Sequence, residues 1–200
     1  LLTQFLSVLL FSLKLAEVKG SMARKSLDRA VDSIKALPSL VGKTLELAPA
    51  IESIAHQMHE SKLTFFLGRG LQYPLAMEAA LKFKEIAYIP SEAFAGGELK
   101  HGPLALIEEG VPVVIFLPKN SLTSKMLSNV EEVKSRGGHI ILFTDDDVKF
   151  SADIVDDFIT LPCTEELIQP LVYVVVAQLL AYYTGVHLGY EVDTPRNLAK

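Results

Sequence analysis

Three charged residues recur at helical spacing in a stretch of the chain that is otherwise apolar. Glu78, Lys82 and Glu85 are four and three residues apart, so on an α-helix they fall within an arc of about 60°. Most other residues between 71 and 88 are apolar, with Lys84 the main exception. A partly desolvated carboxylate beside an ammonium group suits proton transfer to and from a substrate. An ion-pair ladder that only stabilises the helix explains the same spacing equally well.

A histidine follows a pair of glycines a little further along the chain. Residues 96–103 read GGELKHGP, which places His101 close to two glycines and just before Gly102 and Pro103. An imidazole on a flexible loop beside a cleft suits general acid or base catalysis near neutral pH. A loop histidine without a role is the simpler interpretation of this residue taken alone.

Two further groups of residues carry weaker signals. Residues 68–70 read GRG after an apolar run, a position where α/β proteins bind anions, but no run of Ser and Thr accompanies them and a plain turn is favoured. His56, His59 and Glu52 have a spacing that a metal could use. No fourth ligand is evident, so surface positions on a helix are favoured over a metal site. We therefore expect neither a metal nor a cofactor.

The elements that must position these residues alternate along the chain. Short apolar or extended runs, each expected to be a strand, lie at 63–67, 89–95, 111–117, 139–143 and 155–161. Helical patterns lie between and after them, at 71–88, 99–107, 121–136 and 165–187. Strands that are apolar on both faces and alternate with helices indicate a parallel sheet covered on both sides. The prediction is a three-layer αβα sandwich with a five-stranded, flavodoxin-like parallel sheet, preceded by helices.

The two ends of the chain differ from this pattern. Residues 1–19 are expected to form one apolar helix, and 24–59 a helical stretch broken near Pro38 and Pro49. Lys14 and Glu17 leave the first helix short of the ~20 apolar residues that a membrane span needs. The chain begins within this helix without a Met, which suggests a fragment of a longer protein. Residues 189–200 lack periodicity and are expected to be extended.

Composition excludes several classes of function. The net charge is −5 with no basic block, which argues against a nucleic-acid partner. Half of the residues are hydrophobic, as in a compact globular protein. Cys163 is the only cysteine, so no internal disulfide can form, and a reducing cytoplasm is the expected location.

Three stretches of the chain carry a resemblance to a known family. They are residues 67–74 (LGRGLQYP) running into 78–86 (EAALKFKEI), residues 97–106 (GELKHGPLAL), and residues 193–200 (DTPRNLAK). The chain resembles the sugar isomerase (SIS) domains over nearly its whole length. It is most similar to the second SIS domain of the glutamine–fructose-6-phosphate transaminases (isomerising), and the terminal stretch is the most specific of the three. These enzymes convert fructose 6-phosphate and glutamine-derived ammonia into glucosamine 6-phosphate.

The resemblance implies roles for the charged residues of the 71–88 helix. Glu85 matches the carboxylate that moves a proton between C1 and C2 of the sugar. Lys82 matches a lysine that assists these proton movements, and Glu78 a carboxylate that supports the same face and binds the substrate.

It implies further roles outside that helix. His101 matches a histidine that helps to open the sugar ring and reaches into the site of the neighbouring subunit. Lys200 matches a tail lysine that forms a Schiff base with the ketose, and Ala199 beside it is expected to bind the substrate. A homodimer is therefore expected.

The resemblance also implies a division of the chain. Residues 1–20 would be the last helix of a first SIS domain, 21–60 a helical connector, 61–188 the second SIS domain and 189–200 an active-site tail. The Ser/Thr-rich phosphate loop of the first SIS domain and the glutaminase domain with its N-terminal cysteine do not occur in this sequence. We expect the fragment alone to be inactive. A phosphosugar deaminase or deglycase, or a non-catalytic sugar-phosphate-binding module, remains an alternative, against which Lys200 argues.

Overall fold

A computed structural model describes residues 2–197 of the chain. Its helices are α1 (Leu2–Lys19), α2 (Arg24–Leu45), α3 (Ala48–Met58), α4 (Gln72–Lys82), α5 (Thr123–Lys134) and α6 (Gln169–His187). Its strands are β1 (Thr64–Gly68), β2 (Ser91–Ala95), β3 (Pro112–Leu117), β4 (His139–Asp145) and β5 (Asp157–Leu161). Shorter turns of helix are η1 (Phe83–Ala87), η2 (Gly96–His101), η3 (Pro103–Leu106) and η4 (Ala152–Ile154).

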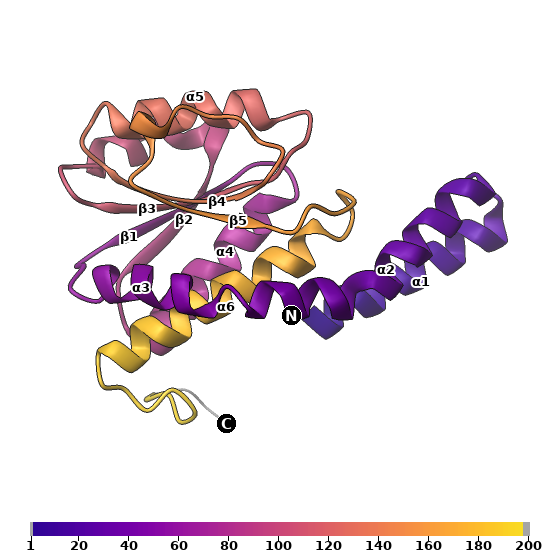
Figure 1. The fold of residues 1–200 in the computed structure, drawn as a ribbon, viewed down its shortest axis with the longest axis horizontal. Helices are drawn as coiled ribbons and strands as arrows, with labels where there is room; N and C mark the ends of the chain where they lie inside the picture. Colours follow the sequence, from indigo (N-terminus) through magenta and orange to yellow (C-terminus); the bar gives the residue numbers. More distant parts are fainter. Residues whose placement is uncertain (1, 198–200) are drawn as a thin grey trace.

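The strands form one sheet in the order β2-β1-β3-β4-β5. Every pairing is parallel, with Phe65 opposite Val113 and Val113 opposite Ile140. All residues of β1 and β3 are buried, because helices cover both faces of a parallel sheet. Helix α5 lies on one face, while α3, α4 and α6 lie on the other (Figure 1). The predicted three-layer αβα fold and its flavodoxin-like strand order are confirmed.

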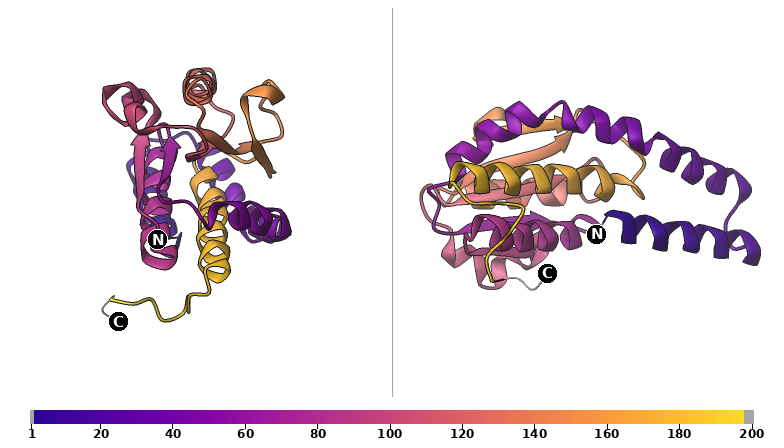
Figure 2. Two further views of the ribbon diagram at one scale, coloured as in Figure 1. Left: turned by 90° about the vertical axis from the view of Figure 1, so that its left-hand side faces the viewer. Right: turned by 90° about the horizontal axis from the view of Figure 1, so that it is seen from below.

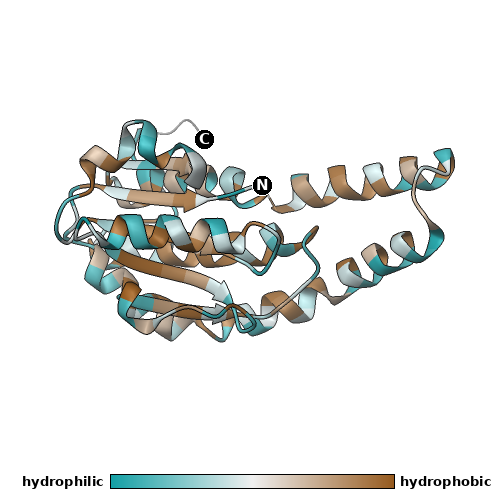
Figure 3. Ribbon diagram, turned by 90° about the horizontal axis from the view of Figure 1, so that it is seen from above, coloured by the Kyte–Doolittle hydropathy of each residue, from teal (hydrophilic) through white to brown (hydrophobic). Residues whose placement is uncertain are grey.

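Alternate side chains of the central strands β1, β3 and β4 enter two separate cores. Phe66, Val114 and Phe116 pack with α3, α4 and α6, whereas Phe65, Val113 and Ile115 pack with α5. The central strands are largely brown in Figure 3 because both sets are apolar. Each such large side chain contributes about 1.5–3 kcal/mol of burial free energy. Helix α4 is therefore fixed against a rigid sheet. It carries Glu78 and Lys82, the first two members of the charged row formed by Glu78, Lys82 and Glu85.

The turn between β1 and α4 sets where the charged row lies. Gly68 ends the strand, and a Cβ atom there would stand 2.1 Å from the backbone oxygen of Gln72. Gly70 has a φ of +62°, a conformation that glycine adopts without steric cost. The two glycines therefore allow α4 to begin at Gln72, shortly after β1 ends at Gly68. Residues 68–70 form the plain turn that the sequence favours.

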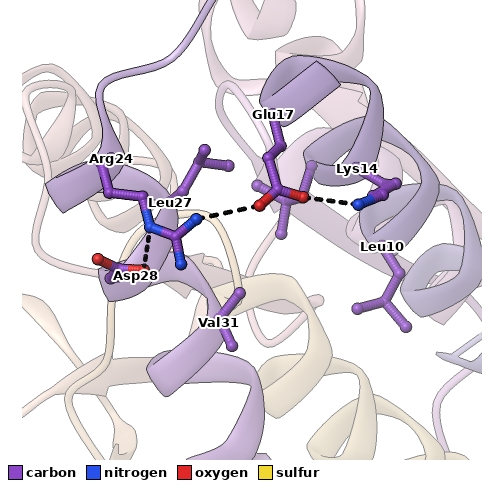
Figure 4. A pocket seen from close by; sticks show the side chains of 8 residues that line it. Leu10, Lys14, Glu17, Arg24, Leu27, Asp28 and Val31 are labelled. Carbon is purple, nitrogen blue, oxygen red and sulfur yellow. Dashed lines mark hydrogen bonds and ion pairs between the residues drawn. The ribbon is translucent and has the colours of Figure 1, made fainter. Parts of the chain in front are cut away.

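Helices α1 and α2 form a hairpin that projects from the sheet (Figures 1 and 3). Glu17 joins its two arms, with Oε2 2.8 Å from Lys14 Nζ and Oε1 3.0 Å from Arg24 Nη1 (Figure 4). The hydrogen bond from Lys14 lowers the pKa of Glu17. Beside these ion pairs is an open cavity of about 270 Å³, and outside it Phe11 and Val18 are exposed.

Two predicted element boundaries are wrong. Helix α2 continues through Pro38, which lies on the exposed side where water can solvate the carbonyl group that proline leaves unpaired. The chain bends instead at Glu46 and Leu47, before Pro49 in the first turn of α3. The helix predicted at 99–107 is two short 3₁₀ segments, because Gly102 has a φ of +137° and Pro103 lacks an N–H donor.

Helix α6 lies at the centre of the face opposite α5. Among residues 2–197 it is the one helix long and apolar enough to cross a membrane by length and composition. However, 67% of that stretch is buried within the fold, as for the core helix of a globular domain. Its last turn leads into the C-terminal segment that lies near the charged row.

Candidate active site

The row of charged side chains begins on the last two turns of α4. The Lys82 ammonium group is 3.9 Å from Glu78 Oε1 and donates a hydrogen bond to Glu85 Oε2. The three side chains are 17–26% exposed, so they are largely shielded from solvent but remain accessible to it. The lysine lies between two carboxylates, an arrangement in which a proton can be taken up by one group while the net charge stays low.

Glu85 lies in a wide turn rather than in regular α-helix. Residues Phe83–Ala87 form a π-helical turn, a feature that is frequent at functional sites. Phe83 anchors this turn, since its ring packs edge-on against Phe66 at 4.9 Å and is fully buried. The turn ends at Tyr88, whose φ of +56° is left-handed. The strained end and the buried anchor fix the carboxylate of Glu85 between them.

The C-terminal segment, residues 189–197, leaves the end of α6 and runs back to this turn (Figure 2, right). The backbone N–H of Arg196 donates a hydrogen bond of 2.8 Å to the hydroxyl oxygen of Tyr88. The guanidinium carbon of Arg196 lies 4.1 Å from the centre of the Tyr88 ring, within the range of a cation–π contact. The ring of Tyr190 packs edge-on against Tyr88 at 4.8 Å.

Beside these contacts lies an open cavity of about 350 Å³. Its lining residues are Lys84, Glu85, Tyr88, Arg196 and Asn197. A carboxylate therefore faces a space that is bordered by cationic groups and by the chain's own C-terminal segment. A small anionic substrate fits such a space by charge, and a carboxylate in it can act as a base.

The structure places His101 on the other side of the sheet from Glu85. His101 is exposed at the end of η2, and the neighbouring Leu99 packs into the core on the α5 side. Lys100 ties η2 to α5 through Glu132, at 2.7 Å. Among the described residues no hydrogen bond or ion pair joins His101 to Glu78, Lys82 or Glu85. Lys200 and Ala199 lie outside the described residues.

The residues with weaker sequence signals lie at two other places in the fold. The 68–70 turn lies beside a cavity of only about 10 Å³. The ring of His187 joins those of His56 and His59, with centroids 4.9 Å and 6.4 Å away. Yet within residues 2–197 no group of three or more His, Cys, Asp or Glu side chains could hold a metal ion.

Comparison with known proteins assigns the family. The family model described as the SIS domain matches residues 57–188, which include the whole sheet and α4. This chain is an SIS domain protein.

Two curated relatives of this SIS protein match almost the whole chain. Both are named glutamine–fructose-6-phosphate aminotransferase [isomerizing]. The protein of Idiomarina loihiensis is 44% identical over 198 residues, and that of Escherichia coli is 46% identical over 198 residues. In each case the match covers 99% of this chain and 32% of the relative. The chain thus spans about a third of their length.

A solved structure supports the same assignment within the SIS family. The C-terminal domain of glucosamine-fructose-6-phosphate aminotransferase from Francisella tularensis matches with a TM-score of 0.91 and 37% identity, covering 96% of this chain and 54% of that one. A glucosamine-6-phosphate deaminase from Thermotoga maritima matches with a TM-score of 0.63 and 22% identity. The latter likeness shows the fold alone.

Sequence reasoning did not single out three residues that border the cavity of this SIS domain. Tyr88 was counted only as an apolar residue of the helix, although a tyrosine just before Ile89 and Pro90 already suggested an element end. Arg196 and Asn197 were quoted only as part of the terminal stretch. The contact of Arg196 with Tyr88 joins positions 108 residues apart, a separation that no local pattern reveals.

Proposed function

We propose that this chain is the C-terminal part of an isomerase that makes glucosamine 6-phosphate from fructose 6-phosphate and glutamine-derived ammonia. The observation that carries the proposal is the carboxylate of Glu85, held by Lys82 and facing a cavity that the C-terminal segment borders. The names of the relatives that match 99% of the chain support it. Because the chain spans 32% of those relatives, we propose that a glutaminase domain and a first SIS domain precede it in the full enzyme.

The proposed chemistry combines Glu85 and Lys82 with the role that the family resemblance implies for Lys200, which lies outside the described residues. The amine of Lys200 adds to the C2 carbonyl of the open ketose and water leaves, which forms an imine. Ammonia then displaces the lysine and leaves an imine of ammonia at C2. Glu85 takes a proton from C1 and returns a proton to C2, while the imine nitrogen gains a proton and the C1 hydroxyl loses one, which converts the ketose imine into the 2-amino aldose. The ammonium group of Lys82 stabilises the ionised form of Glu85 before and after each proton transfer.

The position of His101 supports a homodimer in this proposal. His101 is exposed and lies across the sheet from Glu85, so ring opening by this imidazole needs the site of a second copy. Phosphate binding requires a loop that this chain does not contain, and we assign it to the first SIS domain. The single Cys163 agrees with a cytoplasmic enzyme.

The test is Glu85→Gln in the complete enzyme, with Glu92→Gln, an exposed glutamate on β2, as the matched control. Loss of the proton-transferring carboxylate should lower glucosamine 6-phosphate formation by about 10²- to 10⁴-fold. Glutamate release from glutamine should persist, because the amide chemistry lies in another domain. Both products are measured in the same assay, and thermal unfolding checks that the variants fold.

The Glu92→Gln enzyme should keep both activities. Amino-sugar formation by Glu85→Gln within a few-fold of the wild-type rate would remove Glu85 from the reaction and with it the proposed function of this site.

A further inference from the structure

We propose that Tyr88 is a positioning residue that docks the C-terminal segment onto the turn carrying Glu85. The inference rests on the proposed function, since it concerns how the reactive Lys200 is brought to the sugar. No sequence motif assigns this tyrosine a role, and it lies three residues after Glu85 at the end of the π-helical turn.

Tyr88 contacts the segment through both its hydroxyl and its ring. The hydroxyl oxygen accepts the Arg196 backbone N–H at 2.8 Å, and the ring face lies 4.1 Å from the Arg196 guanidinium carbon. The ring of Tyr190, at the start of the same segment, packs edge-on against the Tyr88 ring, with the ring centres 4.8 Å apart. One side chain therefore contacts the segment at two positions that are six residues apart.

The backbone around Tyr88 aims the side chain at this segment. A left-handed conformation at a tyrosine is uncommon, and here, at φ +56°, it ends the π-helical turn. Such strain persists only where the surroundings compensate for it, and it is concentrated at functional sites. The contacts with Arg196 and Tyr190 are those surroundings.

Gly185 on α6 provides a second, independent sign of close docking. A Cβ atom at this position would lie 3.0 Å from Ile86 Cγ2 and 3.1 Å from Val192 Cγ1. The turn that carries Glu85 and the C-terminal segment thus approach the same point of α6. A side chain at this position would require these neighbours to shift by a few tenths of an ångström.

Docking at Arg196 limits where the reactive amine can be. Lys200 comes four positions after Arg196, so the Cα atoms of the two residues can be at most about 14 Å apart, to which the lysine side chain adds its own length. Anchoring the segment beside Glu85 therefore raises the local concentration of the Lys200 amine at the sugar. Without the anchor, the amine must search a much larger volume before it can form the imine.

The experiment uses the complete enzyme with fructose 6-phosphate and measures how fast borohydride traps a sugar on Lys200. Tyr88→Phe removes only the hydrogen-bond acceptor and should slow trapping about 2- to 10-fold. Arg196→Met removes only the guanidinium group, which is exposed, and should slow it about 2- to 5-fold. Tyr88→Leu removes both interactions and should slow trapping at least about 10-fold.

The control is Tyr182→Phe, an exposed tyrosine on α6, which should trap at the wild-type rate. Glutamine hydrolysis and the thermal midpoint should stay unchanged in Tyr88→Phe and Arg196→Met, which separates docking from folding. If the wild-type enzyme labels no lysine at 200, the proposed function fails. If it does label Lys200 and the Tyr88 and Arg196 variants trap equally fast, only the positioning role of Tyr88 is wrong.

Discussion

Asp145 is a buried carboxyl that links three parts of the molecule. It ends β4 and is 1% exposed. Its Oδ1 accepts a hydrogen bond of 2.7 Å from the Tyr173 hydroxyl of α6, and Oδ2 accepts one of 2.8 Å from the Lys119 backbone. Burial raises the pKa of Asp145, while the bond from Tyr173 lowers it. The bond therefore serves mainly to stabilise the ionised carboxylate inside the fold.

Removing this hydroxyl should give a pH-dependent loss of stability. Since the folded protein holds the Asp145 proton more tightly than the unfolded chain, this group contributes stability that is full below its unfolded pKa and is lost as the pH rises through the folded pKa. Tyr173→Phe raises that folded pKa further. At neutral pH the variant should lose about 1.5–3 kcal/mol of unfolding free energy, and the loss should shrink at mildly acidic pH.

Urea unfolding at the two pH values measures this difference. Tyr182→Phe, on the exposed side of the same helix, is the control and should show no pH-dependent change. An equal loss for Tyr173→Phe at both pH values would mean that the bond does not act on the charged form of Asp145.

At the residue scale, the sequence predicted what helical spacing determines. Glu78, Lys82 and Glu85 share one side because a helix places residues three and four apart together. The contact of Tyr88 with Arg196, and the Asp145 network, depend on how separate elements pack. Neither arises from a local pattern, so neither could be predicted.

At the element scale, the turn from β1 to α4 has no room for a side chain at Gly68. A Cβ at Gly68 would stand 2.1 Å from the backbone oxygen of Gln72 and 2.8 Å from the backbone nitrogen of Tyr73. Backbone atoms cannot rotate away, so α4 itself would have to shift. Glu78 and Lys82, which α4 carries, would move with it, and so would Glu85 on the π-helical turn that continues the helix.

Gly68→Ala should therefore cost stability and activity together. We expect a loss of about 1–3 kcal/mol or more of unfolding free energy, as in other overpacked sites, and a lower rate of amino-sugar formation in the complete enzyme. Gly42→Ala in α2, where a Cβ would meet no atom within 4 Å, is the matched control and should be neutral or slightly stabilising. A Gly68→Ala variant as stable and active as Gly42→Ala would show that α4 has room to move.

The sheet and most helices could be predicted because apolar runs and helical periods are local signals. The errors arose where a single residue type was given too much weight. Pro38 was expected to break a helix, yet on an exposed side α2 continues through it. The helix expected at 99–107 is divided by Gly102 and Pro103 into two 3₁₀ segments.

At the scale of the whole molecule, the two faces of the sheet separate the proposed catalytic groups. Glu85 belongs to the face covered by α4 and α6, and His101 to the face covered by α5. Under the proposed dimer, each site would combine Glu85 of one copy with His101 of the other. Two variants that are each inactive can then restore one another.

Co-expression of Glu85→Gln with His101→Gln tests this arrangement. Random pairing gives mixed dimers in which one of the two sites is intact, so roughly a quarter of the wild-type sites should be active. The rate of glucosamine 6-phosphate formation is compared with that of each variant expressed alone. Absence of any recovery in purified mixed dimers would mean that the histidine serves its own chain's site or none.

Helix α6 contacts the turn of Glu85 and also leads into the C-terminal segment. It supports the turn of Glu85 at Gly185, and four residues later the C-terminal segment begins. Because the turn of Glu85 and the C-terminal segment are both attached to α6, a displacement of this helix moves both of them together. The distance between Glu85 and the C-terminal segment is therefore less sensitive to movements elsewhere in the domain.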